Sequence, residues 1–229
     1  MVAARRRVHE SGFFDEVSAA VADTVADAVT GRTMVALDAG AGTGHYLADA
    51  LDACDSLSGI GMDLSKYCAR AVARCHPRAA SVVADVWRPL PLQTASLGVV
   101  LSIFSPRNTA EFCRVLTSDG LLVVVTPNPD HLREIVGPMG MLAVGADKAE
   151  RLSDSLAGVF ELVGERAVRS VITVDTGAVA DLVAMGPSAF HRTAGEIAAD
   201  AAALTAAGPV PVSLSVTLTA WRPQRSVPR

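Results

Sequence analysis

Apolar residues recur along this chain with two different periods. In residues 4–29 they return every three or four positions, which predicts a helix with an interruption at Gly12. From residue 35 onward, short apolar runs alternate with helical segments, which predicts buried parallel strands joined by helices. The expected strands cover 35–37, 58–62, 80–84, 97–104 and 121–125, and the expected helices cover about 45–54, 65–75 and 109–116.

The last 90 residues are less regular. Residues 137–158 are rich in glycine, alanine and methionine, and we expect a mobile segment or lid with a short helix around 146–157. A strand pair or one long strand is expected over 160–174, followed by helices over 177–185 and 194–207. Residues 212–221 alternate strictly between apolar and polar, which predicts an antiparallel strand at or near the edge of a mostly parallel sheet.

Composition and charge restrict the class of protein. The chain has 229 residues, half of them apolar, which suits an α/β protein with an N-terminal helical arm (1–30) and one larger domain (31–229). The net charge of −4 argues against broad nucleic-acid binding but leaves room for a local basic face. Since no apolar run is long enough to span a bilayer and the N-terminus is not a secretory signal, we expect a cytoplasmic protein with no membrane partner.

The cysteines do not indicate a metal site. Cys54, Cys68, Cys75 and Cys113 contain no C-x-x-C pair, and the histidines do not complete a zinc pattern. We expect free thiols and no bound metal.

A glycine-rich segment, Asp38 to Tyr46, carries the clearest chemical signal. Its sequence DAGAGTGHY follows an apolar strand and opens a helix, so the backbone can turn sharply and approach a ligand. The glycines do not have the G-x-G-x-x-G spacing of dinucleotide sites, which disfavours an NAD-dependent dehydrogenase. The spacing is typical of S-adenosylmethionine (AdoMet) sites, although a tight turn without a ligand is the alternative. The expected cofactor contacts here are Asp38, Gly40, Gly42, Gly44, His45 and Tyr46.

Acidic residues also end the next two strands. Asp63 lies about twenty residues beyond the glycines, where a carboxylate binds both ribose hydroxyls in nucleotide-binding folds, although it could equally cap the following helix. Asp85 is placed to accept a hydrogen bond from the adenine amino group, with the N–H of Val86 serving a ring nitrogen. Leu64 and Phe104 complete the expected cofactor contacts.

Loops that follow the fourth and fifth strands should border the same crevice, because ligands bind at the carboxyl ends of parallel strands. The first such loop contains Ser105 and Pro106, and the second contains His131. His131 is a candidate general base, as are Asp85, if it does not bind adenine, and the backbone carbonyls around Phe104–Pro106. The triplet Arg5–Arg7 is either a solvated helix end or an arm that contacts phosphates. On helix 109–116, Glu111 and Arg114 are expected to be exposed.

Short motifs from Ala4 to about Trp221 match those of a known family. Leu37 to Tyr46 resembles its cofactor motif "LDIGCGEGYY", and Ala4-Arg5-Arg6 resembles its "ARR". The chain thus resembles the large-subunit (23S) ribosomal RNA guanine-N1 methyltransferases, which include macrolide-resistance members. The other similar segments are Asp63-Leu64-Ser65-Lys66 ("DVSK"), Phe104-Ser105-Pro106 ("(Y/F)AP"), Glu111 with Arg114-Val115 ("EL.RV"), Thr126-Pro127 with His131-Leu132 and Glu134 ("TP…HL.E"), and Met185-Gly186-Pro187 ("MTP").

This resemblance implies a fold, a cofactor and a substrate. The fold would be a Rossmann-like class I methyltransferase, with a mostly parallel seven-stranded sheet, an antiparallel C-terminal strand and helices on both faces. The enzyme would use AdoMet to methylate N1 of a guanine in a 23S rRNA hairpin loop, conferring antibiotic resistance in some members. The sequence leaves the oligomeric state open, with a homodimer as one option. The implied substrate contacts are Arg5, Arg6, Ser105, Pro106, His131, Met185, Pro187 and Phe190, the last as a base-stacking ring.

Two departures keep other functions open. Family members usually begin with a small zinc-binding module, which this sequence lacks, and Phe14 stands where the family has tyrosine. A small-molecule methyltransferase of secondary metabolism therefore remains an alternative. A non-catalytic AdoMet-binding protein is a third possibility, which the intact glycine turn, Asp63 and Asp85 disfavour.

Overall fold

The computed structural model describes residues 1–29, 31–143, 145 and 154–224. In chain order its elements are α1 (Val2–Glu10), α2 (Asp15–Val29), β1 (Met34–Ala39), α3 (His45–Ala53), β2 (Leu57–Asp63), α4 (Lys66–Val72), β3 (Ala79–Val83), β4 (Leu97–Ile103), α5 (Thr109–Val115), β5 (Leu116–Pro127), α6 (Arg133–Val136), β6 (Phe160–Val174), α8 (Thr176–Ala184), the 3₁₀ helix η1 (Pro187–His191), α9 (Ala194–Leu204) and β7 (Val210–Pro223). Most of the helix expected over 146–157 lies outside the described residues.

The chain forms two compact units by its internal contacts. The core unit comprises Val17–Thr126, Ala149–Arg166 and Thr217–Arg229, and the helical unit comprises Met1–Glu16, Pro127–Lys148 and Ala167–Val216. Strands β6 and β7 each have residues in both units. The predicted division at residue 30 remains a prediction.

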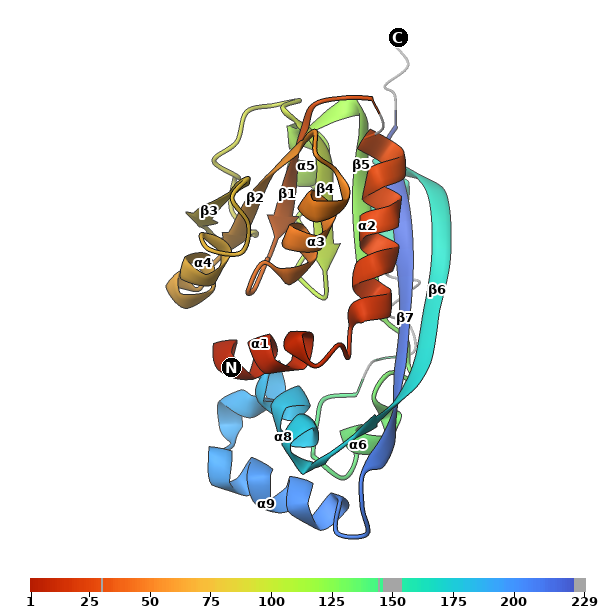
Figure 1. Cartoon of the computed structure of the whole chain (residues 1–229). Coiled ribbons are helices and arrows are strands. Elements are labelled where there is room, and N and C mark those ends of the chain that lie inside the picture. Colours follow the sequence, from red (N-terminus) through yellow and green to blue (C-terminus); the bar gives the residue numbers. More distant parts are fainter. Residues whose placement is uncertain (30, 144, 146–153, 225–229) are drawn as a thin grey trace. The chain divides into compact units, whose positions relative to one another are not determined.

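One seven-stranded sheet has the order β3-β2-β1-β4-β5-β7-β6 (Figure 1). Strands β1 to β5 pair in parallel, and the C-terminal strands are antiparallel, as predicted. From β1 the chain proceeds outward to β2 and β3, then returns to β4 on the other side of β1. The sheet therefore reverses its strand order between β1 and β4, where open α/β sheets bind their ligands.

Helices cover both faces of the sheet in the core unit. On one face, Phe112 and Val115 of α5 pack in a buried cluster with Leu37 and Ala39 of β1. On the other, Gly59 of β2 faces α3. Figure 1 shows α2 and α3 in front of the strands and α5 behind them. Because both faces are covered, all seven residues of β4 are buried, which explains its continuous apolar run.

The N-terminal helix is interrupted where the sequence predicted. Gly12 has a φ of +78°, a left-handed conformation that few other residues adopt without strain. It lies in the turn that separates α1 from α2. Beyond the turn, Val17, Val21 and Val25 are fully buried, which confirms the apolar face predicted for this helix.

Strand β5 is longer than predicted. The sequence suggested a start at Leu121 after a turn at Asp119-Gly120, but the strand begins at Leu116. Its pairing with β4 is irregular, because Leu97 pairs with Leu116 while Val99 pairs with Leu121. The intervening four residues bulge out of the register, so the glycine marks a bulge instead of a strand start.

Strand β7 has the near-edge position that its alternation predicts, with β6 outside it. Its alternate polar residues, however, are buried. Ser213, Ser215 and Thr219 are each less than 8% exposed. Their hydroxyl groups donate to Glu134, to Asp130 and to the Val124 carbonyl, respectively. Period-two polarity here therefore reflects internal hydrogen bonding, because the segment that carries Asp130 and Glu134 lies against the two serines.

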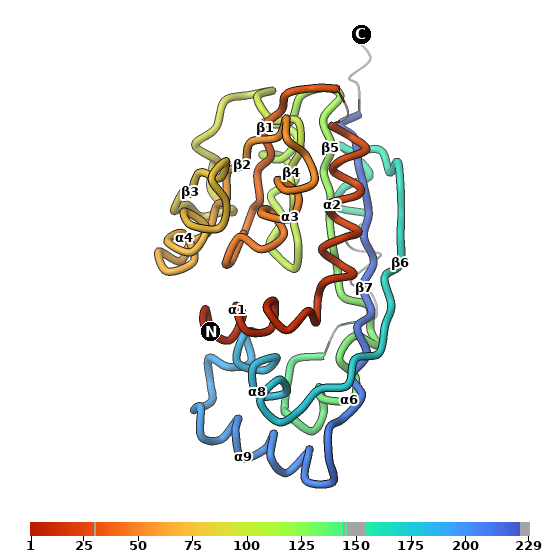
Figure 2. Tube along the Cα trace, viewed as in Figure 1, coloured from red at the N-terminus to blue at the C-terminus, as the bar shows by residue number. Residues whose placement is uncertain are grey.

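In the helical unit, α8 packs against both α1 and α9 (Figure 2). Thr193 and Glu196 form a reciprocal capping box at the start of α9, which fixes where that helix begins. Helix α6 has only four residues, and the residues after it form turns. Residues 160–174 form one long strand, which resolves the alternatives that the sequence left open.

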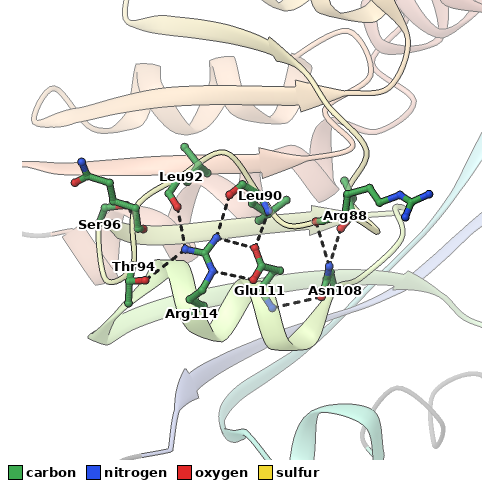
Figure 3. A network of polar contacts seen from close by, with 10 residues as sticks. Arg88, Leu90, Leu92, Thr94, Ser96, Asn108, Glu111 and Arg114 are labelled. Atoms are coloured by element: carbon green, nitrogen blue, oxygen red, sulfur yellow. Dashed lines mark hydrogen bonds and ion pairs between the residues drawn. The ribbon is translucent and has the colours of Figure 1, made fainter.

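Glu111 and Arg114 are partly buried, so the prediction that they are exposed is wrong. Their side chains are only 18% and 32% exposed, because the loop after β3 folds over α5. Arg114 bonds Glu111 at 2.6 Å and donates to the carbonyls of Leu90 and Leu92 at 3.0 and 2.9 Å (Figure 3). Glu111 in turn accepts the Leu90 N–H at 2.6 Å. This ion pair therefore holds the 85–96 loop on α5.

The ion pair yields a prediction about acid stability. The hydrogen bond from Arg114 lowers the pKa of Glu111 to about 2, from 4.5. Because the folded pKa lies below the unfolded one, the stabilisation is present above pH 4.5 and is lost as the pH falls toward 2. Arg114→Met should lower the free energy of unfolding by about 2 kcal/mol at pH 7, with a smaller loss at pH 3, measured by urea unfolding. Arg88→Met, in the same loop but 82% exposed, is the control and should change it by less than about 0.5 kcal/mol.

A second prediction concerns the contact between α4 and β2. A Cβ at Gly61 would overlap a methyl group of Val72, a side chain that is itself fully buried. Gly61→Ala should therefore lower the free energy of unfolding by about 1–3 kcal/mol. Gly195→Ala in α9, where a Cβ meets nothing within 4 Å, should leave stability unchanged or raise it by about 0.5–1 kcal/mol. Equal effects of the two substitutions would contradict the packing argument.

Candidate functional site

The three glycines after β1 all adopt left-handed backbone conformations. The φ angles of Gly40, Gly42 and Gly44 are +84°, +56° and +83°. A Cβ at Gly40 would lie 2.7 Å from the Cβ of Ser105, so the glycine turn and the loop after β4 touch. The N–H groups of Gly40 and Ala41 donate to the Met62 carbonyl at 2.8 and 2.9 Å. The turn is thus fixed against the ends of both neighbouring strands, at the reversal of strand order.

Asp63 joins this turn to the start of α4. Its two carboxylate oxygens accept hydrogen bonds from the N–H groups of Gly42 (2.9 Å) and Ser65 (2.8 Å). Ser65, and not Asp63, caps α4 with its side chain, so the capping alternative is wrong. Each carboxylate oxygen can accept further hydrogen bonds. Asp63 is therefore held in place by backbone donors and can still receive two hydroxyl groups.

Asp38 is a buried carboxyl group at the end of β1. It is 2% exposed, and no donor within the described part of the chain bonds it. Burial, together with the charge of Asp63, raises its pKa to about 7. A carboxyl group in this state is stabilised in its ionised form by a nearby cation. This corner of the site therefore favours a ligand with positive charge.

The ends of β2 and β3 expose apolar side chains next to acidic ones. Leu64 is 70% exposed beside Asp63, and Trp87 is 65% exposed beside Asp85. Asp85 accepts the Trp87 N–H at 3.0 Å. These apolar side chains flank hydrogen-bonding carboxylates, an arrangement that suits a flat heterocycle with polar edges.

Asn108 contributes to this region and was missed from the sequence. Its side chain donates to the Val86 carbonyl at 3.0 Å and accepts the Glu111 N–H at 3.3 Å, so it caps α5 and anchors the loop that carries Asp85 (Figure 3). The spacing Asn108-Thr109-Ala110-Glu111 resembles a capping box and offered a signal for the cap. Nothing in the spacing indicated the contact with Val86.

Phe104 occupies a strained position at the end of β4. Its φ is +52°, which is costly for a residue with a Cβ, and its side chain is 39% exposed. The ring lies 6.5 Å from that of Tyr46 in α3. The next residue, Ser105, is 3.1 Å from Ser102 between hydroxyl oxygens. The positive φ of Phe104 turns the chain at the end of β4, where the next residue, Ser105, lies against the glycine turn.

The remaining predicted substrate residues belong to the helical unit. The Arg5 guanidinium donates to the Met185 carbonyl at 3.1 Å, which brings two of the predicted residues together. Arg6 is exposed, and Pro187 opens η1, in which Phe190 is 72% exposed. Arg7 forms a two-pronged ion pair with Asp181 of α8. The arginine triplet therefore combines two structural side chains with one that faces solvent.

His131 is buried in the helical unit. Its Nδ1 accepts the Ser215 N–H at 3.2 Å, and its ring lies 6.4 Å from that of Phe14. This bond assigns the proton of the neutral imidazole to Nε2. Accepting a second proton would break the bond to Ser215, so the geometry favours a role in fixing the loop after β5 over that of a general base.

No group of three or more His, Cys, Asp or Glu side chains within the described ranges could hold a metal ion. None of the helices in those ranges is long and apolar enough to cross a membrane.

Comparison with known proteins identifies the family. The methyltransferase-domain family matches residues 37–124. The chain is 42% identical over 224 residues to a 23S rRNA (guanine(748)-N(1))-methyltransferase of Streptomyces fradiae, covering 97% of this chain and 79% of the relative. It is 41% identical, with the same coverage, to a putative 23S rRNA (guanine-N(1)-)-methyltransferase of Micromonospora griseorubida. A SAM-dependent methyltransferase of Geobacter sulfurreducens, solved with S-adenosyl-L-homocysteine, superimposes with a TM-score of 0.55 at 13% identity, covering 89% of this chain and 90% of that one.

The residues at the ends of β1, β2 and β3 fit AdoMet, the cofactor of such enzymes. The glycine turn leaves room for a close ligand, the buried Asp38 suits a positively charged one, and Asp63 has acceptors for a ribose. Leu64 and Trp87 offer apolar surface for the adenine ring. By its sequence identity, its coverage and this cofactor site, the chain belongs to the 23S rRNA guanine-N1-methyltransferases.

Proposed function

We propose that this protein methylates N1 of a guanine in a hairpin loop of 23S rRNA. The observation that carries the proposal is the 42% identity to the Streptomyces fradiae enzyme over nearly the whole chain, combined with an intact glycine turn and Asp63. A decayed glycine turn would instead have favoured a non-catalytic relative. The site of action would be the cytoplasm, and protection against macrolides remains a prediction from the family resemblance. Assembly as a homodimer also remains a prediction.

The cofactor contacts follow from the core unit. Asp63 would accept both ribose hydroxyls of AdoMet, while Asp85 and the Val86 N–H would bind the adenine edge. Leu64 and Phe104 would pack against the cofactor, and the turn from Gly40 to Tyr46 would pass its amino-acid end. The Asn108 side chain and the Glu111–Arg114 pair support these contacts because they fix the loop that carries Asp85.

The substrate contacts are assigned to two groups of residues. In the core unit, Ser105 and Pro106 follow the strained Phe104 beside the glycine turn, where the target base would lie. In the helical unit, Arg6 is a solvent-facing cation suited to phosphate, and Phe190 is an exposed ring suited to base stacking. Arg5, Met185, Pro187 and His131 would support these two through the contacts described above.

Bound AdoMet would supply an electrophilic methyl group on its sulfonium sulfur. The protein's own task is then to hold the guanine in place, exclude water and accept the proton that N1 carries. The strained loop at Phe104 and Ser105 is positioned to orient the base. The sequence offered His131, Asp85 and the backbone carbonyls around Phe104–Pro106 as candidates for proton acceptance. The bond from the Ser215 N–H to Nδ1 disfavours His131.

Methyl transfer to RNA can be measured directly. The wild-type protein should transfer label from AdoMet to a 23S rRNA hairpin that contains the guanine at position 748, and primer extension should then stop there, because N1 methylation blocks base pairing. A hairpin with adenine at that position should not be labelled. Transfer to a panel of small molecules, with none to RNA, would overturn the proposal in favour of a secondary-metabolite enzyme.

Measured by calorimetry, Asp63→Ala should weaken AdoMet binding by about 10- to 100-fold, because two hydrogen bonds to a charged group are lost. Asp55→Ala is the matched control, since Asp55 is a fully exposed aspartate before β2. It should leave calorimetric AdoMet affinity unchanged. Unchanged affinity for Asp63→Ala would contradict the ribose assignment.

Cofactor affinity should also depend on pH through Asp38. A bound cation favours the ionised carboxylate, so affinity should rise up to about tenfold per pH unit between pH 5.5 and 7 and then level off. Asp38→Asn should bind AdoMet more weakly, and its affinity should no longer change over this range. Asp52→Asn, an exposed residue, should keep the wild-type profile. A flat wild-type profile would show that Asp38 does not interact with the cofactor's charge.

A further inference from the structure

Arg107 follows the loop at the end of β4 and differs from the other arginines of the protein. It is half-buried, yet within the described residues it has no hydrogen bond and no ion pair. Desolvation lowers the pKa of its guanidinium, and no acidic group offsets this effect. A cation that has lost part of its water without gaining a partner is unfavourable, so such a position indicates a missing anion.

The other described arginines show what is normal in this chain. Those that are half-buried all donate to protein oxygens. Arg78 bonds the Leu57 carbonyl, Arg114 bonds Glu111, Arg192 bonds the Met139 carbonyl, and Arg5 bonds the Met185 carbonyl. Those with neither such a bond nor an ion pair are exposed to water; they are Arg6, Arg70, Arg74, Arg169 and Arg222. Arg107 alone among the described arginines combines partial burial with no bonding partner.

The backbone on both sides of Arg107 is fixed. Two residues before it, Ser105 contacts the glycine turn at Gly40 and lies 3.1 Å from the Ser102 hydroxyl. Immediately after it, Asn108 caps α5 and bonds the Val86 carbonyl at 3.0 Å. The guanidinium is therefore carried on a short, anchored segment between the glycine turn and the loop of Asp85. This is a preorganised position, not a flexible surface cation.

We propose that Arg107 binds a phosphodiester group of the RNA, next to the nucleotide that is methylated. This inference rests on the proposed function and adds a specific residue to it. A guanidinium presents two parallel N–H donors to two phosphate oxygens, and a base in the site brings a phosphate on each side. In a protein of net charge −4, one uncompensated cation beside the site also gives the RNA a local point of attraction.

The carboxylate of the cofactor is the other possible anion. The cofactor also carries a sulfonium and an ammonium group, and the buried Asp38 suits those positive charges. A guanidinium directed at the same end of the ligand would oppose this arrangement. The phosphate is therefore favoured, and the two sources of anion give different results in the experiment.

The experiment compares Arg107→Gln with wild type in three measurements. Affinity for the 23S rRNA hairpin, measured by fluorescence anisotropy, should fall about tenfold at low salt, because a charge-assisted contact is lost. The slope of log affinity against log salt should become shallower by about 0.7–0.9, the value for one phosphate contact. Calorimetric affinity for AdoMet without RNA should stay within twofold of wild type.

Two further variants exclude trivial explanations. Arg107→Lys keeps the charge but loses the paired donors, so it should retain the salt slope and lose only part of the affinity. Arg222→Gln removes an exposed, unpaired arginine near the start of β5, away from the carboxyl ends of the parallel strands, and should behave as wild type. The melting temperature of Arg107→Gln should not fall, since no protein contact is lost.

Each other outcome overturns the inference. Unchanged RNA affinity and salt slope in Arg107→Gln would exclude the phosphate contact. A loss of AdoMet affinity would assign the residue to the cofactor carboxylate, and a lowered melting temperature with a normal salt slope would assign it a structural role. If the wild-type protein neither binds nor methylates the hairpin, the proposed function itself fails. The wild-type measurement alone therefore separates that failure from a failure of the inference about Arg107.

Discussion

The hydrogen bond between the Gly42 N–H and the Asp63 carboxylate is the interaction around which the cofactor site is built. It joins the turn after β1 to the end of β2, and the second oxygen of Asp63 reaches the start of α4. The turn itself needs a glycine at position 40, because a Cβ there would lie 2.7 Å from the Cβ of Ser105 in the loop after β4. The cost is a buried Asp38 whose charge is disfavoured by burial and by Asp63.

A second set of polar contacts holds the other wall of the site. Glu111 and Arg114 bind the backbone of the loop after β3, and Asn108 binds it at Val86. These are side-chain contacts with main-chain groups, so they fix the loop whatever side chains it carries. The loop can then expose Trp87 and Asp85 without losing its shape. The same helix start carries Arg107, which links the rigidity of this wall to the proposed contact with RNA.

The helical unit follows a similar logic with different residues. Glu134 and Asp130 accept hydrogen bonds from Ser213 and Ser215, and Arg5 and Arg7 are bound to Met185 and Asp181. Most polar residues of the family-like motifs in this unit are thus engaged within the protein. Arg6, by contrast, faces solvent, and so does the aromatic ring of Phe190. These two side chains are therefore the better candidates for contact with a substrate.

Sequence alone determined the features that depend on local chemistry. The spacing of apolar residues predicted the parallel strands, and the spacing of glycines predicted the turn after β1. Asp63 and Asp85 were predicted as cofactor contacts because each follows the end of an apolar strand. All of these features depend on residues that are close together in the chain. Only the tertiary structure showed that Glu111 and Arg114 are partly buried, that the serines of β7 are internal donors, that His131 is bonded to Ser215, and that Arg107 lacks a partner. Each of these depends on which distant segment covers a side chain, and neither period nor composition encodes that contact.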